Sequence, residues 1–135
     1  MFKVIIAGSR EFYDYRLLCA TLDHLFQHIP LQEIEIVCGK AKGADILGER
    51  YAHEHQLAIK YFPAKWKVLG KRAGYVRNEE MAEYADALVA FWDGKSPGTR
   101  HMIAIAKKYG LPIRVKNFLE EGAKNESNKN SVGCR

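Results

Sequence analysis

The stretch EIEIVCGKAKGADILGERYAHEHQLAIKYFP, residues 33–63, holds two apolar runs separated by a glycine-containing loop and a helix-like segment. The two runs, 33–39 and 58–63, have the length and the branched side chains of buried strands. The segment between them, 43–56, is predicted to be a helix with an apolar side formed by Ile46, Leu47 and Tyr51. A strand, a helix and a strand in this order predict a parallel β-α-β unit.

The same alternation continues on both sides of this unit. Further strands are predicted at 3–8, 86–94 and 111–116, and further helices at 13–28, 73–85 and 97–110. Asp14 is the expected N-cap of the first helix, and Gly110 the expected C-cap of the last. The pattern predicts a single Rossmann-like α/β domain over 1–116, with three layers and a mostly parallel five-stranded sheet.

The amino-acid composition limits the classes of protein to which the chain can belong. The chain has 135 residues and 47% hydrophobic content, which fits one domain, and no apolar run is long enough to span a membrane. The segment 117–135 is rich in Asn, Lys, Glu and Ser and is predicted to be a mostly disordered tail. Three cysteines in no metal or redox spacing indicate a reduced, cytoplasmic setting, and neither a metal nor a cofactor is predicted. The net charge of +5 suits an anionic ligand, although mildly basic proteins are also common.

Parallel sheets of this kind bind ligands beyond the carboxyl ends of their strands, so the loops there are the candidate site. In the loop 39–45, two glycines precede a helix start, and Lys40 and Lys42 add positive charge. Such a loop can hold a phosphate on its backbone N–H groups. The alternative is a tight turn in which Asp45 stabilises the helix start, and the loop alone does not decide between the two.

Two further features favour an anion site. The loop 93–99 repeats glycines and hydroxyl residues before a helix, although Ser96 or Thr99 can simply cap that helix. Arg77 lies near the start of its own helix on the apolar side, where a cation opposes the helix dipole and calls for an anionic partner. A surface ion pair with Glu80 is the alternative.

Two other features of the sequence allow two interpretations each. The stretch 65–77 carries five cations and no acid, and it can clamp a phosphate or form a solvated basic loop. Trp92 can stack on a base, or it can pack in the core.

Four segments, IIAGSREF, CGKAKGAD, AGYVRNEEM and WDGKSPGTRHMI, occur in this order between residues 3 and 116. Together they resemble the YspA/YpsA-related branch of the SLOG superfamily, which also contains the LOG-type phosphoribohydrolases and the DprA-type DNA-processing proteins. The resemblance implies a Rossmann-like fold and binding of a nucleotide or a nucleotide-derived ligand. This branch is largely uncharacterised, so the resemblance implies no particular activity.

The resemblance is carried over residue by residue. Gly8-Ser9-Arg10 matches the family's first loop, and the loop 39–45 matches GGxxGAD, except that Lys40 replaces the second glycine. Arg77-Asn78 matches the RN pair, whose Arg in the hydrolase branch serves substrate binding and catalysis. Gly98-Thr99 matches the GT of PGGxGTxxE, but the catalytic glutamate of that motif is missing. The predicted ligand-binding residues are Gly8, Ser9, Arg10, Gly39, Gly43, Ala44, Asp45, Arg77, Asn78, Asp93, Gly94, Ser96, Gly98 and Thr99.

Three functions remain compatible with the sequence. The first is binding of a nucleotide-like small molecule, for example as a sensor. The second is hydrolysis of an N-glycosidic or phosphate bond, with Asp93 or Glu79 in place of the missing glutamate. The third is DprA-like binding of single-stranded nucleic acid, which is not favoured because the sequence shows no continuous aromatic and basic platform. A homo-oligomer is suggested only by the related branches.

Overall fold

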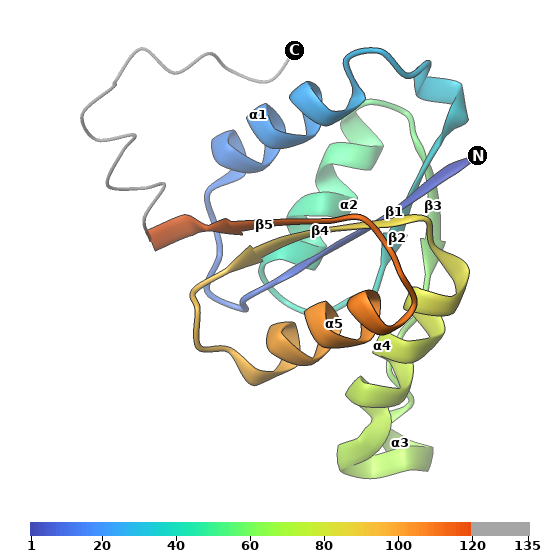
Figure 1. Cartoon of the computed structure of the whole chain (residues 1–135), viewed down its shortest axis with the longest axis vertical. Coiled ribbons are helices and arrows are strands. Elements are labelled where there is room, and N and C mark those ends of the chain that lie inside the picture. The colour runs from blue at the N-terminus through green and yellow to red at the C-terminus, as the bar shows by residue number, and fades with distance from the viewer. Residues whose placement is uncertain (120–135) are drawn as a thin grey trace.

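The computed structural model describes residues 1–119, which form one five-stranded sheet between two layers of helices (Figure 1). The strands are β1 (Phe2–Gly8), β2 (Ile34–Cys38), β3 (Ala58–Tyr61), β4 (Ala87–Trp92) and β5 (Ile113–Asn117). Their order is β3-β2-β1-β4-β5, and every neighbouring pair is parallel. The predicted Rossmann-like α/β fold is confirmed.

Helices cover both faces because each inner strand is apolar on both sides. Along β1, Val4 and Ile6 pack into one core, and Ile5 and Ala7 pack into the other. The first core includes residues of α1 (Tyr15–Phe26) and α2 (Ala44–Glu54), and the second includes residues of α4 (Ala73–Tyr84) and α5 (Pro97–Lys108). Successive side chains of a strand point to opposite faces, so one short apolar run supplies both cores.

The capping residues predicted from the sequence lie at or next to the observed helix ends. The Asp14 carboxylate accepts a hydrogen bond from Leu17 N at 3.0 Å, which confirms this residue as the N-cap of α1. The C-cap residue of α5 is Tyr109, one position before the expected Gly110, which follows the cap with a left-handed φ of 74°. One detail was wrong: Ile46, expected on the buried side of α2, is 51% exposed.

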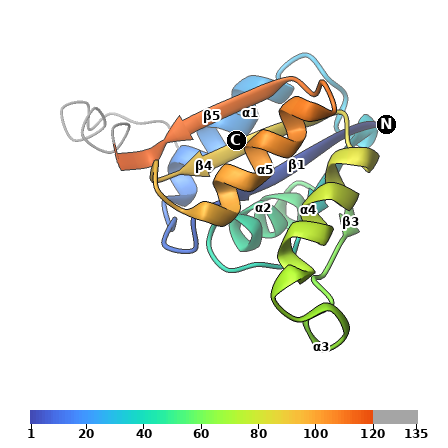
Figure 2. The ribbon, with the colours of Figure 1, turned by 60° about the horizontal axis from the view of Figure 1, so that its bottom comes forward.

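The sequence patterns do not reveal α3 (Trp66–Leu69), because four residues are too few to show a helical period. The basic stretch 65–77 contains α3, a 3₁₀ turn over 70–72 and the beginning of α4, so it is not an open loop. Both ribbon views show α3 projecting beyond the end of α4, away from the sheet (Figures 1 and 2).

The predicted tail, 117–135, lies mostly outside the described residues. Of its first residues, Asn117 ends β5, and the Phe118 ring lies 5.0 Å from the ring of Phe12. Within residues 1–119, no helix is long and apolar enough to cross a membrane. The same residues contain no group of three or more His, Cys, Asp or Glu side chains that could hold a metal ion.

The topology fixes the location of a crevice. Strand order reverses between β1 and β4, so the connection after β1 leads toward β2 while the connection after β4 leads toward β5. These two connections diverge and leave an opening at the carboxyl edge of the sheet. The loops 8–10 and 93–99 therefore meet at this opening.

Candidate functional site

A cavity of about 870 Å³ opens at this edge of the sheet. Its walls come from the loops after β1, β2 and β4, and from α3, α4 and the first turns of α5. Most of the predicted ligand-binding residues line it: Gly8, Ser9, Arg10, Gly39, Asp45, Arg77, Asn78, Ser96, Gly98 and Thr99. The other four predicted residues, Gly43, Ala44, Asp93 and Gly94, are not among the lining residues.

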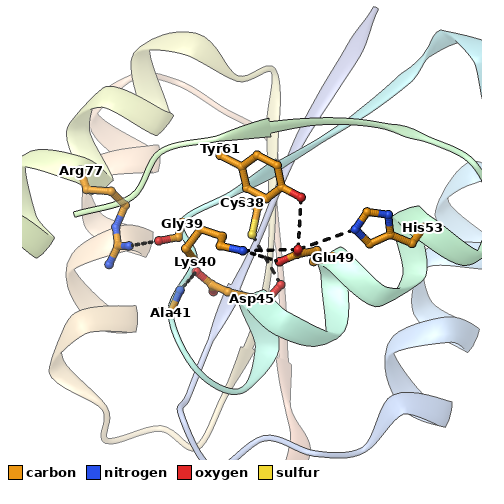
Figure 3. Close-up of polar contacts among 9 residues, drawn as sticks. All are labelled: Cys38, Gly39, Lys40, Ala41, Asp45, Glu49, His53, Tyr61 and Arg77. Carbon is orange, nitrogen blue, oxygen red and sulfur yellow. Dashed lines mark hydrogen bonds and ion pairs between the residues drawn. The ribbon is translucent and has the colours of Figure 1, made fainter. Parts of the chain in front are cut away.

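In the loop after β2, backbone amides donate hydrogen bonds to a buried carboxylate. Asp45 is only 5% exposed, and it accepts a hydrogen bond from Ala41 N at 3.2 Å. Burial raises the pKa of Asp45 to about 7, against the opposing effects of Arg77 and of the amides of Ala41 and Gly39. The Arg77 guanidinium donates from Nη1 to the Gly39 carbonyl oxygen and so connects α4 to this loop (Figure 3).

The start of α2 is packed tightly against the loop after β1. Gly43 has a φ of 77°, and a Cβ there would lie 2.2 Å from the Ser9 carbonyl oxygen. Both the left-handed backbone and the close approach require glycine. This end of α2 therefore anchors two loops to each other.

Lys40, which replaces the second glycine of the family motif, has a φ of 60° and so adopts a left-handed backbone that glycine favours. Lys40 lines the cavity, and its ammonium pairs with Glu49 of α2, with Nζ and Oε2 3.3 Å apart. Tyr61 and His53 approach the same carboxylate (Figure 3). Lys40 is thus paired with α2, and the other cationic residues of the described lining are Arg10, Lys42, Lys71 and Arg77.

In the loop after β4, a more exposed carboxylate makes similar contacts. Asp93 accepts hydrogen bonds from Lys95 N at 2.8 Å and from Ser96 N at 2.7 Å. The Ser96 hydroxyl lies 2.8 Å from Asp93 Oδ2 and 3.0 Å from Ser9 Oγ, and Ser9 Oγ accepts from Asp93 N. These bonds, led by that from the Ser96 amide, lower the pKa of Asp93 to about 2. The Asp93 carboxylate is thus a weak base that is already hydrogen-bonded within the loop.

Neither α2 nor α5 has a side-chain cap hydrogen bond, but the start of α5 is less crowded than that of α2. Ser96 is the N-cap residue, but its hydroxyl is bonded to Asp93 and Ser9 and makes no hydrogen bond to the first turn of α5. A Cβ on Gly98 would meet no heavy atom within 4 Å. The amides of Gly98 and Thr99 therefore lie in a first turn that borders the cavity and lacks the usual side-chain cap.

Asn78 joins α4 to this open turn. Its side-chain oxygen accepts from Arg77 Nε at 3.2 Å, and its Nδ2 lies 3.3 Å from the Gly98 carbonyl oxygen and 3.1 Å from His101 Nδ1. Burial lowers the pKa of His101, which keeps the ring neutral at pH 7 and able to accept. Asn78 thus holds Arg77 next to α5.

The structure does not bring Glu79 to the cavity. This residue follows Arg77 by two positions, about 200° around the helix, and contacts the Tyr109 hydroxyl at 3.0 Å and Lys108 Nζ at 3.8 Å. The third residue after Thr99, where the hydrolase motif has glutamate, is Met102, which is buried and lines the cavity. Among residues 1–119, the only carboxylates in the lining are those of Glu11 and Asp45.

Trp92 is not part of the lining. Its indole N–H donates to the Ser96 carbonyl oxygen at 3.1 Å, and the Arg100 guanidinium lies 5.7 Å from the ring centre. The aromatic lining residues are instead Trp66 and Tyr75, which the motif analysis missed. The sequence signals near them were the cluster of cations in 65–77 and the segment AGYVRNEEM, which contains Tyr75.

Comparisons with known proteins agree with the motif analysis. A family model described as the YspA, cpYpsA-related SLOG family matches residues 2–68. The Gene 61 protein of Mycobacterium phage D29 is 34% identical over 119 residues, which cover 84% of this chain and 94% of the phage protein.

Two solved structures share the fold. The molybdenum cofactor binding protein from Rippkaea orientalis matches with a TM-score of 0.64 at 16% identity, over 98% of this chain and 88% of that protein. DNA processing protein A from Streptococcus pneumoniae matches with a TM-score of 0.65 at 17% identity, over 99% of this chain and 59% of that protein. At these identities the likeness concerns the fold alone.

Proposed function

Because the chain belongs to the YspA, cpYpsA-related SLOG family, we propose that it binds a nucleotide or a nucleotide-derived phosphate compound in the cavity at the carboxyl edge of the sheet. The observation that carries the proposal is that Arg77 and the uncapped start of α5 border one cavity and are linked through Asn78. A guanidinium and free helix amides are the groups that bind phosphate in other proteins.

The charge of the lining supports this proposal. Arg10, Lys42, Lys71 and Arg77 are cationic, whereas Glu11 is the one exposed carboxylate of the described lining. Asp45 is buried, and burial raises its pKa to about 7, so it offsets this charge less than an exposed carboxylate does. The cavity volume lies within the range of about 300–1,000 Å³ that is usual for small-molecule sites.

Binding is favoured over hydrolysis by the positions of the carboxylates. Asp93 is held by loop amides, Glu79 lies on another side of α4, and Met102 occupies the position of the hydrolase glutamate. Incubation with the four nucleoside 5′-monophosphates, followed by chromatography, should release no free base. Release of base that depends on Asp45 would instead support hydrolysis.

Arg77→Ala tests the binding proposal. A charge-assisted contact of this kind contributes about 1.5–3 kcal/mol, so affinity for the best nucleotide in a calorimetric screen should fall roughly tenfold to over a hundredfold. Arg77→Lys should recover only part of the loss if the contact is bidentate. Arg114→Ala, which removes an exposed arginine of β5 outside the cavity, is the matched control. Equal affinity of Arg77→Ala and the parent protein would contradict the proposal.

Single-stranded nucleic acid is a second candidate ligand. DNA processing protein A from Helicobacter pylori, which binds single-stranded DNA, shares the fold at 19% identity with a TM-score of 0.57, over 93% of this chain and 73% of that protein. In and next to α3, the exposed Trp66 is close in sequence to four cations, Lys65, Lys67, Lys71 and Arg72. A labelled oligonucleotide whose affinity falls steeply with salt, and falls further in Lys67→Ala, would favour this candidate.

A further inference from the structure

Two half-exposed aromatic residues line the cavity. Trp66, the first residue of α3, is 54% exposed, and Tyr75 in α4 is 50% exposed. Both line the cavity together with Pro63 and Ala64. Figure 2 shows that α3, which begins at Trp66, projects from the body of the protein.

Trp66 lies close to the anion-binding end of the site. A Cβ built on Gly74 would lie 3.5 Å from Trp66 Cη2 and 3.9 Å from Arg77 Nη2. The indole and the guanidinium therefore flank the same glycine, which has no side chain to separate them. A ligand group held by Arg77 is within reach of the indole.

Tyr75 packs against the ring of His101. Its ring lies edge-on to the His101 ring, with centroids 4.4 Å apart and an interplanar angle of 68°. His101 is itself bonded to Asn78. An aromatic ring fixed in this way loses little conformational freedom when a ligand packs on its exposed side.

We propose that Trp66 and Tyr75 form an aromatic subsite that packs against the planar ring of the bound ligand. This inference rests on the proposed function and makes it more specific: the ligand class is a phosphate compound that carries a heteroaromatic base, such as a nucleoside 5′-phosphate, and not a simple sugar phosphate. Base rings stack on aromatic side chains with little dependence on base identity. The subsite thus recognises the presence of a base while Arg77 holds the phosphate.

The other aromatic side chains near this edge are already engaged. Trp92 bonds to Ser96, and the Tyr61 ring lies under Lys40, whose Nζ is 4.9 Å from the ring centre. Within the described residues, Trp66 and Tyr75 are the aromatic residues that line the cavity. The inference therefore concerns these two rings.

The test compares the four nucleoside 5′-monophosphates with ribose 5-phosphate by calorimetry. These ligands share phosphate and ribose and differ in the base. The parent protein should bind the best monophosphate roughly 5- to 150-fold more tightly than ribose 5-phosphate, the range typical of one base stacked on an aromatic side chain. Trp66→Ala and Tyr75→Ala should each remove much of this preference and leave the affinity for ribose 5-phosphate unchanged, whereas Trp66→Phe should retain most of it.

Two controls make the outcome specific. Val68→Ala alters an 80% exposed residue of α3 outside the lining and should change neither affinity. Trp92→Phe leaves Trp66 as the sole tryptophan of the two in the chain. In that variant, Trp66 fluorescence should respond to monophosphates and not to ribose 5-phosphate, a readout that does not require removing the indole.

The possible failures are distinguishable. If the parent binds ribose 5-phosphate and monophosphates equally, or if Trp66→Ala weakens both equally, the aromatic subsite is refuted while the proposed function stands. If Arg77→Ala changes no affinity, the phosphate site is refuted. If the parent binds none of these compounds, both proposals fail.

Discussion

The loops 39–45 and 93–99 have similar sequences but different roles. In each loop, an aspartate carboxylate accepts hydrogen bonds from two backbone amides of the loop. Asp45 is buried and its pKa is raised to about 7, whereas Asp93 is partly exposed and its pKa is lowered to about 2. The difference shows that desolvation, and not the number of amide contacts, decides the charge state of a carboxylate in such a loop.

The two loops also differ in how closely the following helix is packed. Gly43, before α2, touches the backbone of the loop after β1, while Gly98, in α5, has open space where a side chain would be. The first loop therefore holds the fold together, and the second is available to a ligand. Four experiments test this division.

Gly43→Ala should have the largest effect. A Cβ at this position would require both a strained backbone and displacement of Ser9, and each contributes about 1–3 kcal/mol. We expect the free energy of unfolding in urea to fall by about 4 kcal/mol or more. Gly98→Ala is the matched control, and similar losses in the two variants would contradict the difference between the loops.

The pH dependence of stability should separate the two aspartates. The folded protein holds a proton on Asp45 more tightly than the unfolded chain does, so its contribution is greatest below about pH 4 and is lost as pH rises to about 7. Asp93 behaves oppositely: its contribution is present above about pH 4 and is lost as pH falls toward 2.

Urea titrations between pH 3 and 8 would measure this difference. Asp45→Asn should flatten the decline between pH 4 and 7, which by linkage is on the order of 4 kcal/mol at most. Asp93→Asn should alter only the acid side. A parent protein whose stability rises from pH 4 to 7, with no change in Asp45→Asn, would refute the raised pKa of Asp45.

Lys40 offers a smaller test within the first loop. Lys40→Gly and Lys40→Ala both remove the ion pair with Glu49, but only glycine accepts the left-handed backbone without strain. The glycine variant should therefore be more stable than the alanine variant by about 1 kcal/mol in urea unfolding. Equal stabilities would mean that the loop rearranges when the lysine is removed.

Gly98→Ala should have the smallest effect on stability and a visible effect on binding. Alanine favours the helix, so the free energy of unfolding should stay constant or rise by up to about 1 kcal/mol. Affinity for ribose 5-phosphate should fall a few-fold, because the new methyl group occupies the open space beside the first turn of α5. Unchanged affinity in calorimetry would place the phosphate elsewhere on the cavity wall.

The sequence predicts the fold well because strand alternation and helix caps are local signals. The apolar runs that became β1 and β4, and the Asp14 cap, need no long-range information. The site is less predictable because contacts such as Arg77 to Gly39 join residues that are distant along the chain. Nor can a sequence pattern tell that Gly43 is packed and Gly98 open, or that Glu79 faces α5 residues.

The three contacts of Asn78 have a thermodynamic consequence. They hold Arg77, the first turn of α5 and His101 together in the absence of ligand, so the site is preorganised. A ligand then need not order these groups on binding, and less of its interaction energy is spent against entropy. Loss of these hydrogen bonds of Asn78 should therefore appear in calorimetry as a more unfavourable binding entropy, even though the Asn78 side chain need not touch the ligand.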